Sequence, residues 1–463
     1  MLSKRQQHFQ EPGCATNAAK GDKERTKGCG SGKGALKPGA AAGGCAYDGA
    51  KVALQPITDA AHLVHGPIAC EGNAWDNRHA ASSGPMLYRR GLTTDLSEMD
   101  VIHGGEKKVY QAIKAAVRRH APPAVFVYQT CVPALIGDDL EAVCKRAAEK
   151  MATPVIPVMA PGFAGSKNLG NKLAARTLFD HVIGTEEPDD ATDRDVLIIG
   201  DYNLSGELWQ VTPLFERIGI RLRACITGDA RYRDVATAHR ARAAMVVCSH
   251  AMAPLARGLE ERYGIPWFEG SFHGLADTGR AVLTMARLLV ERGADPALLE
   301  RAEAVVAEEG ARAEQRLAPY RARLRGKRVL LYTGGHKTWS VVSALQELGM
   351  RVIGTSVRKA TDEDAARART RIGEDGELFG QIAAPEMYRM LRDREADIML
   401  SGGRTQFVAL KARTPWLDIN QERHFAYAGF DGMVTLARQL DRALGNPVFE
   451  TVRRPAPWED GAA

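Results

Sequence analysis

Residues 195–209 read DVLIIGDYNLSGELW, and this stretch indicates how the chain folds. It begins with the apolar run DVLIIG (195–200), passes through the loop DYNLSGE, and enters a helix. Two more apolar runs follow, RLRACIT (221–227) and AAMVVCS (243–249). Short apolar runs that alternate with amphipathic helices are typical of parallel strands covered on both faces.

The same alternation occurs on both sides of this stretch. On its N-terminal side lie AVFVYQT (124–130), a turn at Cys131, a helix from about Asp138, and TPVIPVMAP (153–161). On its C-terminal side lie four more apolar runs, KRVLLYT (327–333), RVIGTS (351–356), ADIMLS (396–401) and TPWLDI (414–419). The chain therefore contains three units of one kind.

These units predict an α/β fold with three doubly wound, Rossmann-like domains built on parallel sheets. Helical sequence from about Leu275 to Arg325, broken at residues 293–296, joins the second unit to the third. Because no linker rich in Pro and Ser separates the units, we expect interlocked domains. The predicted segments are a basic N-terminal arm and three domains, at 1–40, 41–193, 194–325 and 326–463.

The positive charge of the chain is concentrated in the arm. Residues 1–40 hold eight Lys or Arg and three acidic residues, a net of +5 out of +6 for the whole chain. A Gly-rich basic arm on a nearly neutral body, with no recognition-helix pattern, indicates a solvated tail and argues against nucleic-acid binding. Cys14 and Cys29 lie in this arm and are expected to be surface thiols, although metal binding is an alternative.

The composition is that of a globular protein without membrane segments. The 463 residues are 45% hydrophobic and 25% charged, which is ordinary for a soluble protein. No run reaches the roughly 18 apolar residues needed to span a bilayer, and the first residues, MLSKRQQHFQEPGC, contain no apolar segment of signal-peptide length. We therefore expect a cytoplasmic protein, whose eight Cys residues are thiols or metal ligands in a reducing compartment.

Three cysteines occupy junctions that are rich in Gly and Pro. Cys45 lies in GGCAYDGA, Cys70 in HGPIACEGNAWDNR, and Cys131 in YQTCVPALIGDDL. Glycine lets the backbone approach an inorganic centre closely, and the long gaps between the cysteines exclude a local zinc knuckle. Three thiolates are one fewer than a four-iron cluster normally takes, so a partner chain or an open iron position would complete the set. The alternative is three unrelated buried thiols.

A fourth candidate ligand, Cys248, closes the apolar run AAMVVCSHAMAP, with His250 two residues later. Ligands of doubly wound sheets collect at the carboxyl ends of strands, which is where Cys248 is predicted to lie. From its position alone, a buried structural thiol remains the alternative.

Other motifs argue against more common activities. The sequence GGHKT follows a strand but lacks the frame GxxxxGK[ST], and GDYNLSGE lacks GxGxxG, so neither predicts a nucleotide site. No nucleophile, base and orienting residue occur together as in a hydrolase. His62, His65 and His103 lie near the cysteine motifs and are expected to be core or loop residues.

Six motifs together resemble one family across nearly the whole chain. They are GAAAGGCAYDGAKVALQPITDAAHLVHGPIACEGNAWDNR, YQTCVPALIGDDL, GFAGSKNLGNKLA, IGDYNLSGELW, YTGGHKTW and INQERHFAYAGFDG. They are similar to the E subunit of the nitrogenase cofactor-assembly scaffold, the NifE family, a paralogue of the α subunit of the molybdenum–iron nitrogenase. The resemblance implies the three-domain fold of nitrogenase component 1.

The resemblance also implies roles for the candidate residues. Cys45, Cys70 and Cys131 would hold a 4Fe-4S cluster shared with a partner subunit. Cys248 matches the thiolate ligand at one end of the iron–molybdenum cofactor, and would hold an iron–sulfur precursor of that cofactor.

Three positions depart from the catalytic α subunit. Asn420 replaces the His that ligates molybdenum, and Asn171 replaces a His that can donate protons beside the cofactor. Lys337 replaces an Arg packed beside the cofactor, and with His336 it could attract an anion such as homocitrate or molybdate. An amide is a poor metal ligand beside imidazole, so one end of the cluster would be free. His424 could substitute for the missing ligand, although a loop His bonded to its neighbours is the simpler expectation.

The function that the resemblance implies is an assembly scaffold without an independent catalytic site. It would pair with a NifN-type subunit as an α2β2 heterotetramer and receive a precursor from a radical enzyme. The nitrogenase iron protein would deliver molybdenum and homocitrate, and the cofactor would pass to the apo-nitrogenase molybdenum–iron protein. The alternatives are a catalytic nitrogenase-type α subunit or related iron–sulfur reductase, with residual reductase activity possible in a scaffold, and a metal-free structural subunit. Asn420 and Asn171 argue against a catalyst.

Overall fold

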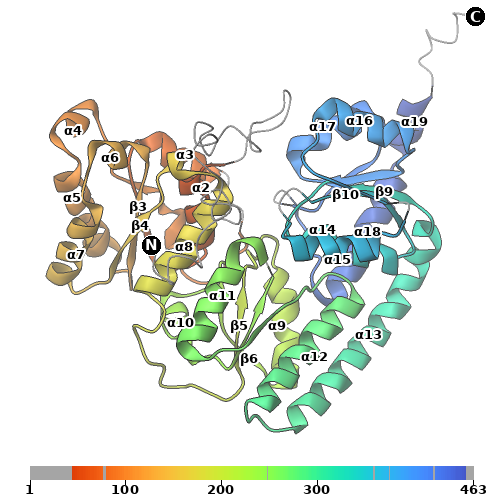
Figure 1. Ribbon diagram of the computed structural model, residues 1–463, viewed down its shortest axis with the longest axis horizontal. Coiled ribbons are helices and arrows are strands. Elements are labelled where there is room, and N and C mark those ends of the chain that lie inside the picture. Colours follow the sequence, from red (N-terminus) through yellow and green to blue (C-terminus); the bar gives the residue numbers. More distant parts are fainter. Residues whose placement is uncertain are drawn as a thin grey trace, which may run out of the picture.

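The computed structural model describes residues 44–76, 80–247, 249–357, 360–374, 376–420 and 423–454. The chain forms three α/β units that follow one another in sequence, with the second lying between the first and the third (Figure 1). Every strand pairing within the three sheets is parallel. The predicted fold class is therefore confirmed, whereas the predicted domain boundaries stay predictions.

The first sheet has the strand order β2-β1-β3-β4. Its strands are β1 (Ala61–His65), β2 (Leu92–Thr93), β3 (Val125–Gln129) and β4 (Val155–Met159). Its helices are α2 (Ala46–Leu54), α3 (Ile68–Asp76), α4 (Glu98–His103), α5 (Glu106–His120), α6 (Cys131–Ile136), α7 (Leu140–Met151) and α8 (Lys167–His181). The helix predicted from about Asp138 is α7, which begins after Asp139 because the Asp139 carboxylate accepts a 3.0 Å hydrogen bond from the amide of Ala142.

The second sheet has the order β6-β5-β7-β8. Its strands are β5 (Asp195–Ile199), β6 (Arg221–Ile226), β7 (Ala243–Val246) and β8 (Trp267–Glu269). Its helices are α9 (Glu207–Ile218), α10 (Tyr232–Ala236), α11 (Ser249–Tyr263) and α12 (Leu275–Glu291). The long helix α13 (Ala297–Leu324) then runs to the third unit (Figure 1), so the predicted helical connection with its break at 293–296 is present.

The third sheet has the order β11-β10-β9-β12-β13. Its strands are β9 (Arg328–Leu331), β10 (Arg351–Ser356), β11 (Glu377–Phe379), β12 (Ile398–Ser401) and β13 (Trp416–Asp418). Its helices are α14 (Lys337–Glu347), α15 (Asp362–Ile372), α16 (Ala384–Asp393), α17 (Gln406–Lys411), α18 (Gly429–Leu444) and α19 (Pro447–Arg453). Counted within this unit the order is 3-2-1-4-5, as in a dinucleotide-binding sheet.

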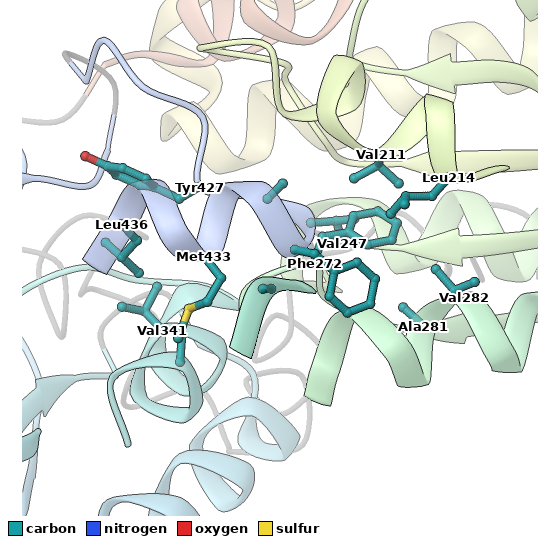
Figure 2. Packing of buried hydrophobic residues seen from close by; sticks show 14 of the residues in the cluster. Val211, Leu214, Val247, Phe272, Ala281, Val282, Val341, Tyr427, Met433 and Leu436 are labelled. Carbon is teal, nitrogen blue, oxygen red and sulfur yellow. The ribbon is translucent and has the colours of Figure 1, made fainter. Parts of the chain in front are cut away.

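The units share hydrophobic cores. One core cluster contains residues of the second unit, such as Phe272 and Val282, and residues of the third unit, such as Val341 and Met433 (Figure 2). Another joins the first and second units. Separation of the units would expose this apolar surface to water, so they are interlocked. No helix in the described ranges combines the length and the apolar character needed to cross a membrane.

Candidate functional site

Two predicted ligands, Cys70 and Cys131, lie where the strand order of the first sheet reverses. In the first sheet, β1 and β3 are neighbours whose chain connections leave in opposite directions. Such a switch point opens a crevice at the carboxyl ends of the two strands. Cys70 lies in the first turn of α3, five residues after β1, and Cys131 is the first residue of α6, two residues after β3.

Cys45 reaches the same crevice from outside the sheet. It precedes the first residue of α2 and forms an isolated antiparallel bridge with Ser166, just before α8. Gly162 lies between two of the thiols, because a Cβ atom built on it would be 3.0 Å from Sγ of Cys131 and 3.1 Å from Sγ of Cys45. The structure thus brings together residues that are 86 positions apart in the chain.

Cys70 belongs to the same cluster of thiols. Burial raises its pKa, and the neighbouring Cys131 and Cys45 raise it further, while a hydrogen bond with Thr130 lowers it. All three cysteines are partly exposed and free of disulfides. A metal cluster would offset the mutual repulsion of the three thiolates by neutralising their charge.

The three thiols are candidate ligands of an iron–sulfur cluster. Within the described ranges, no three His, Cys, Asp or Glu side chains are close enough to hold one metal ion. Gly162 adds no side chain beside the thiols of Cys45 and Cys131, where a Cβ atom would crowd both sulfur atoms. The three thiols could therefore supply three of the four ligands of such a cluster.

The surface around the thiols is apolar. Ile68 in α3 is 60% exposed, Leu135 in α6 is 74% exposed, and Phe163 beside Gly162 is 59% exposed. Exposed large apolar side chains that lie close together are a common feature of surfaces that bind other proteins.

The second predicted site lies between the second and third units, and Cys248 lies outside the described residues. In the chain, Cys248 lies between Val247 and helix α11, which begins at Ser249. The backbone amide of Val247 donates to the carbonyl of Ile199 at 2.8 Å. The β5 and β7 strands flank the switch point of the second sheet. Position 248 therefore follows a strand at a switch point, while its role as a ligand stays a prediction.

Asn420 is held by two neighbours. The Thr333 hydroxyl donates to Oδ1 of Asn420 at 3.0 Å, and the backbone N–H of Asn420 donates to Oδ1 of Asp418 at 2.6 Å. Lys337 Nζ donates to the carbonyl of Ile419 at 2.6 Å. The loops after β9 and β13 are thus tied together, and they bring Lys337 and Asn420 into one locality.

A buried ion pair that the sequence did not predict connects the segment after Asn420 to the second unit. Arg423 pairs with Glu207, and their side chains are only 5% and 6% exposed. The Ser205 hydroxyl also donates to the carbonyl of Arg423 at 2.8 Å. Both charged residues belong to motifs noted in the sequence, GDYNLSGE and NQERH, but 216 positions separate them.

The charges in this locality act on each other. Burial and the neighbouring Glu207 raise the pKa of Asp201 to about 6. Burial and Arg423 lower the pKa of Lys337 to about 7. The charge states of Asp201 and Lys337 therefore depend on burial and on the neighbouring charged groups.

His336 lies beside Lys337, and its proposed part in attracting an anion stays a prediction. Burial, Lys337 and Arg423 lower its pKa to about 3, so its imidazole is neutral near physiological pH. It stacks on His273 with ring centroids 5.6 Å apart, and its buried Nε2 has no hydrogen-bond partner among the described residues. The attraction of an anion would therefore rest on Lys337 and Arg423.

The remaining candidates make no described hydrogen bond with Asn420. Asn171 is buried on α8, and its Oδ1 has no hydrogen-bond partner within the part of the chain that the structure describes. No described hydrogen bond connects it with Asn420 or Lys337. His424 is exposed, as is His103. His62 and His65 are core residues, as expected, and both lie in β1.

Comparisons with known proteins agree with this architecture. Residues 45–445 match the family described as nitrogenase component 1 type oxidoreductase. The nitrogenase iron-molybdenum cofactor biosynthesis protein NifE of Mesorhizobium japonicum is 61% identical over 99% of this chain and 92% of its own length. The protein of the same name from Klebsiella pneumoniae is 49% identical over 92% of this chain and 95% of its own length.

A solved structure shows the same fold. The structure titled "Nitrogenase Cp1 at pH 5" superposes with a TM-score of 0.83 at 27% identity, covering 92% of each chain. The high identity over nearly full length confirms the resemblance that the motifs indicated. The chain therefore belongs to the nitrogenase component 1 type oxidoreductase family and, within it, to the NifE proteins.

Proposed function

We propose that this chain is a scaffold subunit for assembly of the nitrogenase iron–molybdenum cofactor. It holds an iron–sulfur precursor while molybdenum and homocitrate are added, and then releases the product to apo-nitrogenase. The observation that carries the proposal is the amide of Asn420, fixed by Thr333 in the pocket region, in a chain whose relatives are named for cofactor biosynthesis.

A scaffold must release what it binds. The Cys248 thiolate is the proposed grip on the precursor, and Asn420 is proposed at its opposite end. An amide binds transition metals weakly compared with imidazole. The guanidinium of Arg423 and, when protonated, the ammonium of Lys337 lie near Asn420, where they could bind the carboxylates of homocitrate. Asn171 supplies an amide in place of a proton donor.

Cys45, Cys70 and Cys131 are the proposed ligands of a resident 4Fe-4S cluster, with the fourth ligand from a NifN-type partner. The apolar surface of Ile68, Leu135 and Phe163 beside them supports burial against that partner. When bound, such a cluster supplies one-electron exchange. The iron protein of nitrogenase is the proposed electron donor, and a radical enzyme the proposed source of the precursor.

A reductase is the second candidate, favoured by the likeness to a solved nitrogenase. Asn420 and Asn171 oppose it, because neither amide replaces a ligating or proton-donating imidazole. Slow residual reductase activity is compatible with the scaffold.

The test is anaerobic co-purification with the N-type partner, followed by loading with precursor and incubation with iron protein, molybdate and homocitrate. The scaffold should then activate cofactor-free nitrogenase while reducing little substrate itself. Sustained reduction of dinitrogen by the complex, without activation of cofactor-free nitrogenase, would favour the reductase. Colourless, iron-free protein after anaerobic purification would contradict both.

A further inference from the structure

A buried histidine and a buried aspartate lie directly behind the cysteine cluster. His65 Nε2 and Asp138 Oδ2 are 2.9 Å apart, and their side chains are 0% and 4% exposed. His65 is the last residue of β1, which precedes the loop to Cys70. Asp138 follows α6, whose first residue is Cys131. The pair thus joins the two chain segments that carry these cysteines.

The His65–Asp138 pair lies at the end of the pairing between β1 and β3. The last pairing between β1 and β3 is His65 with Gln129, so the ladder cannot set the spacing of the residues beyond it. Thr130 continues the connection, because its amide and its hydroxyl both donate to the carbonyl of His65, at 3.1 and 2.9 Å. The hydrogen bond between His65 and Asp138 then connects the end of the segment that carries Cys131 to the start of the segment that carries Cys70.

The hydrogen bonds around the pair form one directed chain. A carboxylate only accepts, so His65 donates from Nε2 to Asp138, and Nδ1 is left to accept the Thr94 hydroxyl at 3.1 Å. The Thr94 oxygen in turn accepts the Gly66 amide at 3.0 Å. The other oxygen of Asp138 accepts the Gly105 amide at 2.9 Å. Every member has a partner, and such a network holds one geometry.

We propose that His65 and Asp138 are positioning residues that set the spacing of Cys70 and Cys131 for the resident cluster, an inference that rests on the proposed cluster site. Neither residue touches a thiol in the described contacts. They act through the loops, as partners of metal ligands do when they orient those ligands. Cys45 is held separately, by its bridge to Ser166, so the His65–Asp138 pair does not set its position.

The chain offers a matched control in His62. It lies on the same strand, three residues before His65, and is equally buried. Its partners are the Tyr128 hydroxyl at 2.8 Å and the Ile57 carbonyl at 3.0 Å, so neither bond reaches the loop of Cys70 or that of Cys131. Loss of His62 perturbs the core without releasing the two loops from each other.

The experiment compares His65→Gln, Asp138→Asn and His62→Gln in the anaerobic complex with the N-type partner. The readouts are the rate at which a chelator removes iron and the electron paramagnetic resonance spectrum of the reduced cluster. Partners of metal ligands typically contribute tenfold to a hundredfold in metal affinity. We expect His65→Gln and Asp138→Asn to lose iron at least about tenfold faster, with altered g values, and His62→Gln to match the parent.

Further variants distinguish failure of the proposed cluster site from failure of the proposed positioning role. If Cys70→Ala and Cys131→Ala keep their iron, the proposed cluster site is wrong, and the positioning role fails with it. If these two lose iron while His65→Gln and Asp138→Asn retain the parental rate and spectrum, only the positioning role is overturned. Equal effects of His62→Gln and His65→Gln would also overturn it. If His65→Gln does not fold, Thr94→Val removes one bond of the chain at constant size and should give the same spectral change.

Discussion

The Thr333 hydroxyl donates a 3.0 Å hydrogen bond to Oδ1 of Asn420. This bond turns the amide nitrogen toward Gly402, where a Cβ atom would lie 3.0 Å from Nδ2. Residue 420 is therefore fixed between the loops after β9 and β12 and cannot rotate freely. A substitution of Asn420 therefore changes the chemical group at a position that the structure holds in place.

Asn420→His should slow the release of the finished cofactor. An imidazole is a stronger ligand than an amide, and each tenfold gain in retention corresponds to about 1.4 kcal/mol. The time course of activation of apo-nitrogenase, with parent and variant at equal iron loading, measures this. Thr333→Val is the control, because it removes the bond to Asn420 and adds no ligand. Unchanged transfer by Asn420→His would place the pocket elsewhere in the chain.

Cys248→Ala should lose the precursor but keep the interfacial cluster, because the two sites depend on different thiolates. The iron content per heterodimer should fall only by the amount of iron in the precursor, and the signal of the reduced 4Fe-4S cluster should persist. A variant that binds precursor normally would remove Cys248 from the site.

Gly162→Ala should displace the interfacial cluster without changing any ligand. The added methyl group would lie 3.0 Å from Sγ of Cys131 and 3.1 Å from Sγ of Cys45, in space that the cluster would need. We expect a loss of most of the interfacial iron, measured per heterodimer. Gly380→Ala is the control, because a Cβ atom there meets nothing within 4 Å. Full iron content in Gly162→Ala would show that the cluster does not approach Gly162.

Single changes of Cys45, Cys70 or Cys131 to Ala should each remove the interfacial cluster and weaken pairing with the partner. Cluster binding and subunit association are linked, since the cluster binds only the assembled site. Iron analysis and the elution volume of the complex follow the two effects. Cys144→Ala, a buried thiol on α7 outside the crevice, should keep both. Three cysteine variants with parental iron would contradict the assignment.

The complex should lose stability as the pH falls below about 6.5, the ordinary pKa of histidine. Burial lowers the pKa of His62 to about 3, and it also lowers the pKa values of His65, His273 and His336. Below pH 6.5 the unfolded chain binds more protons at these residues than the folded chain does, so acid favours unfolding. Each histidine contributes up to about 1.4 kcal/mol per pH unit.

The thermal midpoint at pH 7.5 and at pH 5.5 measures this effect. His62→Gln should show a smaller difference between the two pH values than the parent, because one proton-binding group is gone. Equal differences in parent and variant would contradict a neutral, buried His62.

Most of the strands could be predicted from local sequence, whereas three short edge strands could not. β5, β9 and β10 are apolar runs, as expected, because both faces of a parallel sheet are buried. The edge strands β2, β8 and β11 have two or three residues each and pair only because a neighbouring strand is already in place. The interior strand β1 was missed because His62 and His65 interrupt its apolar run, and their buried hydrogen bonds make them acceptable there.

Local sequence alone determines the parallel-sheet class, the break between α12 and α13, and which cysteines occupy glycine-rich junctions, because these features depend on patterns within a few residues. Only the tertiary structure decides that Cys45, Cys70 and Cys131 meet, that Gly162 keeps space beside two of them, and that His65 reaches Asp138. The same holds for Arg423 and Glu207, which are 216 positions apart. Such pairings follow from strand order and from the packing of whole units, and no local pattern encodes which distant segments will meet.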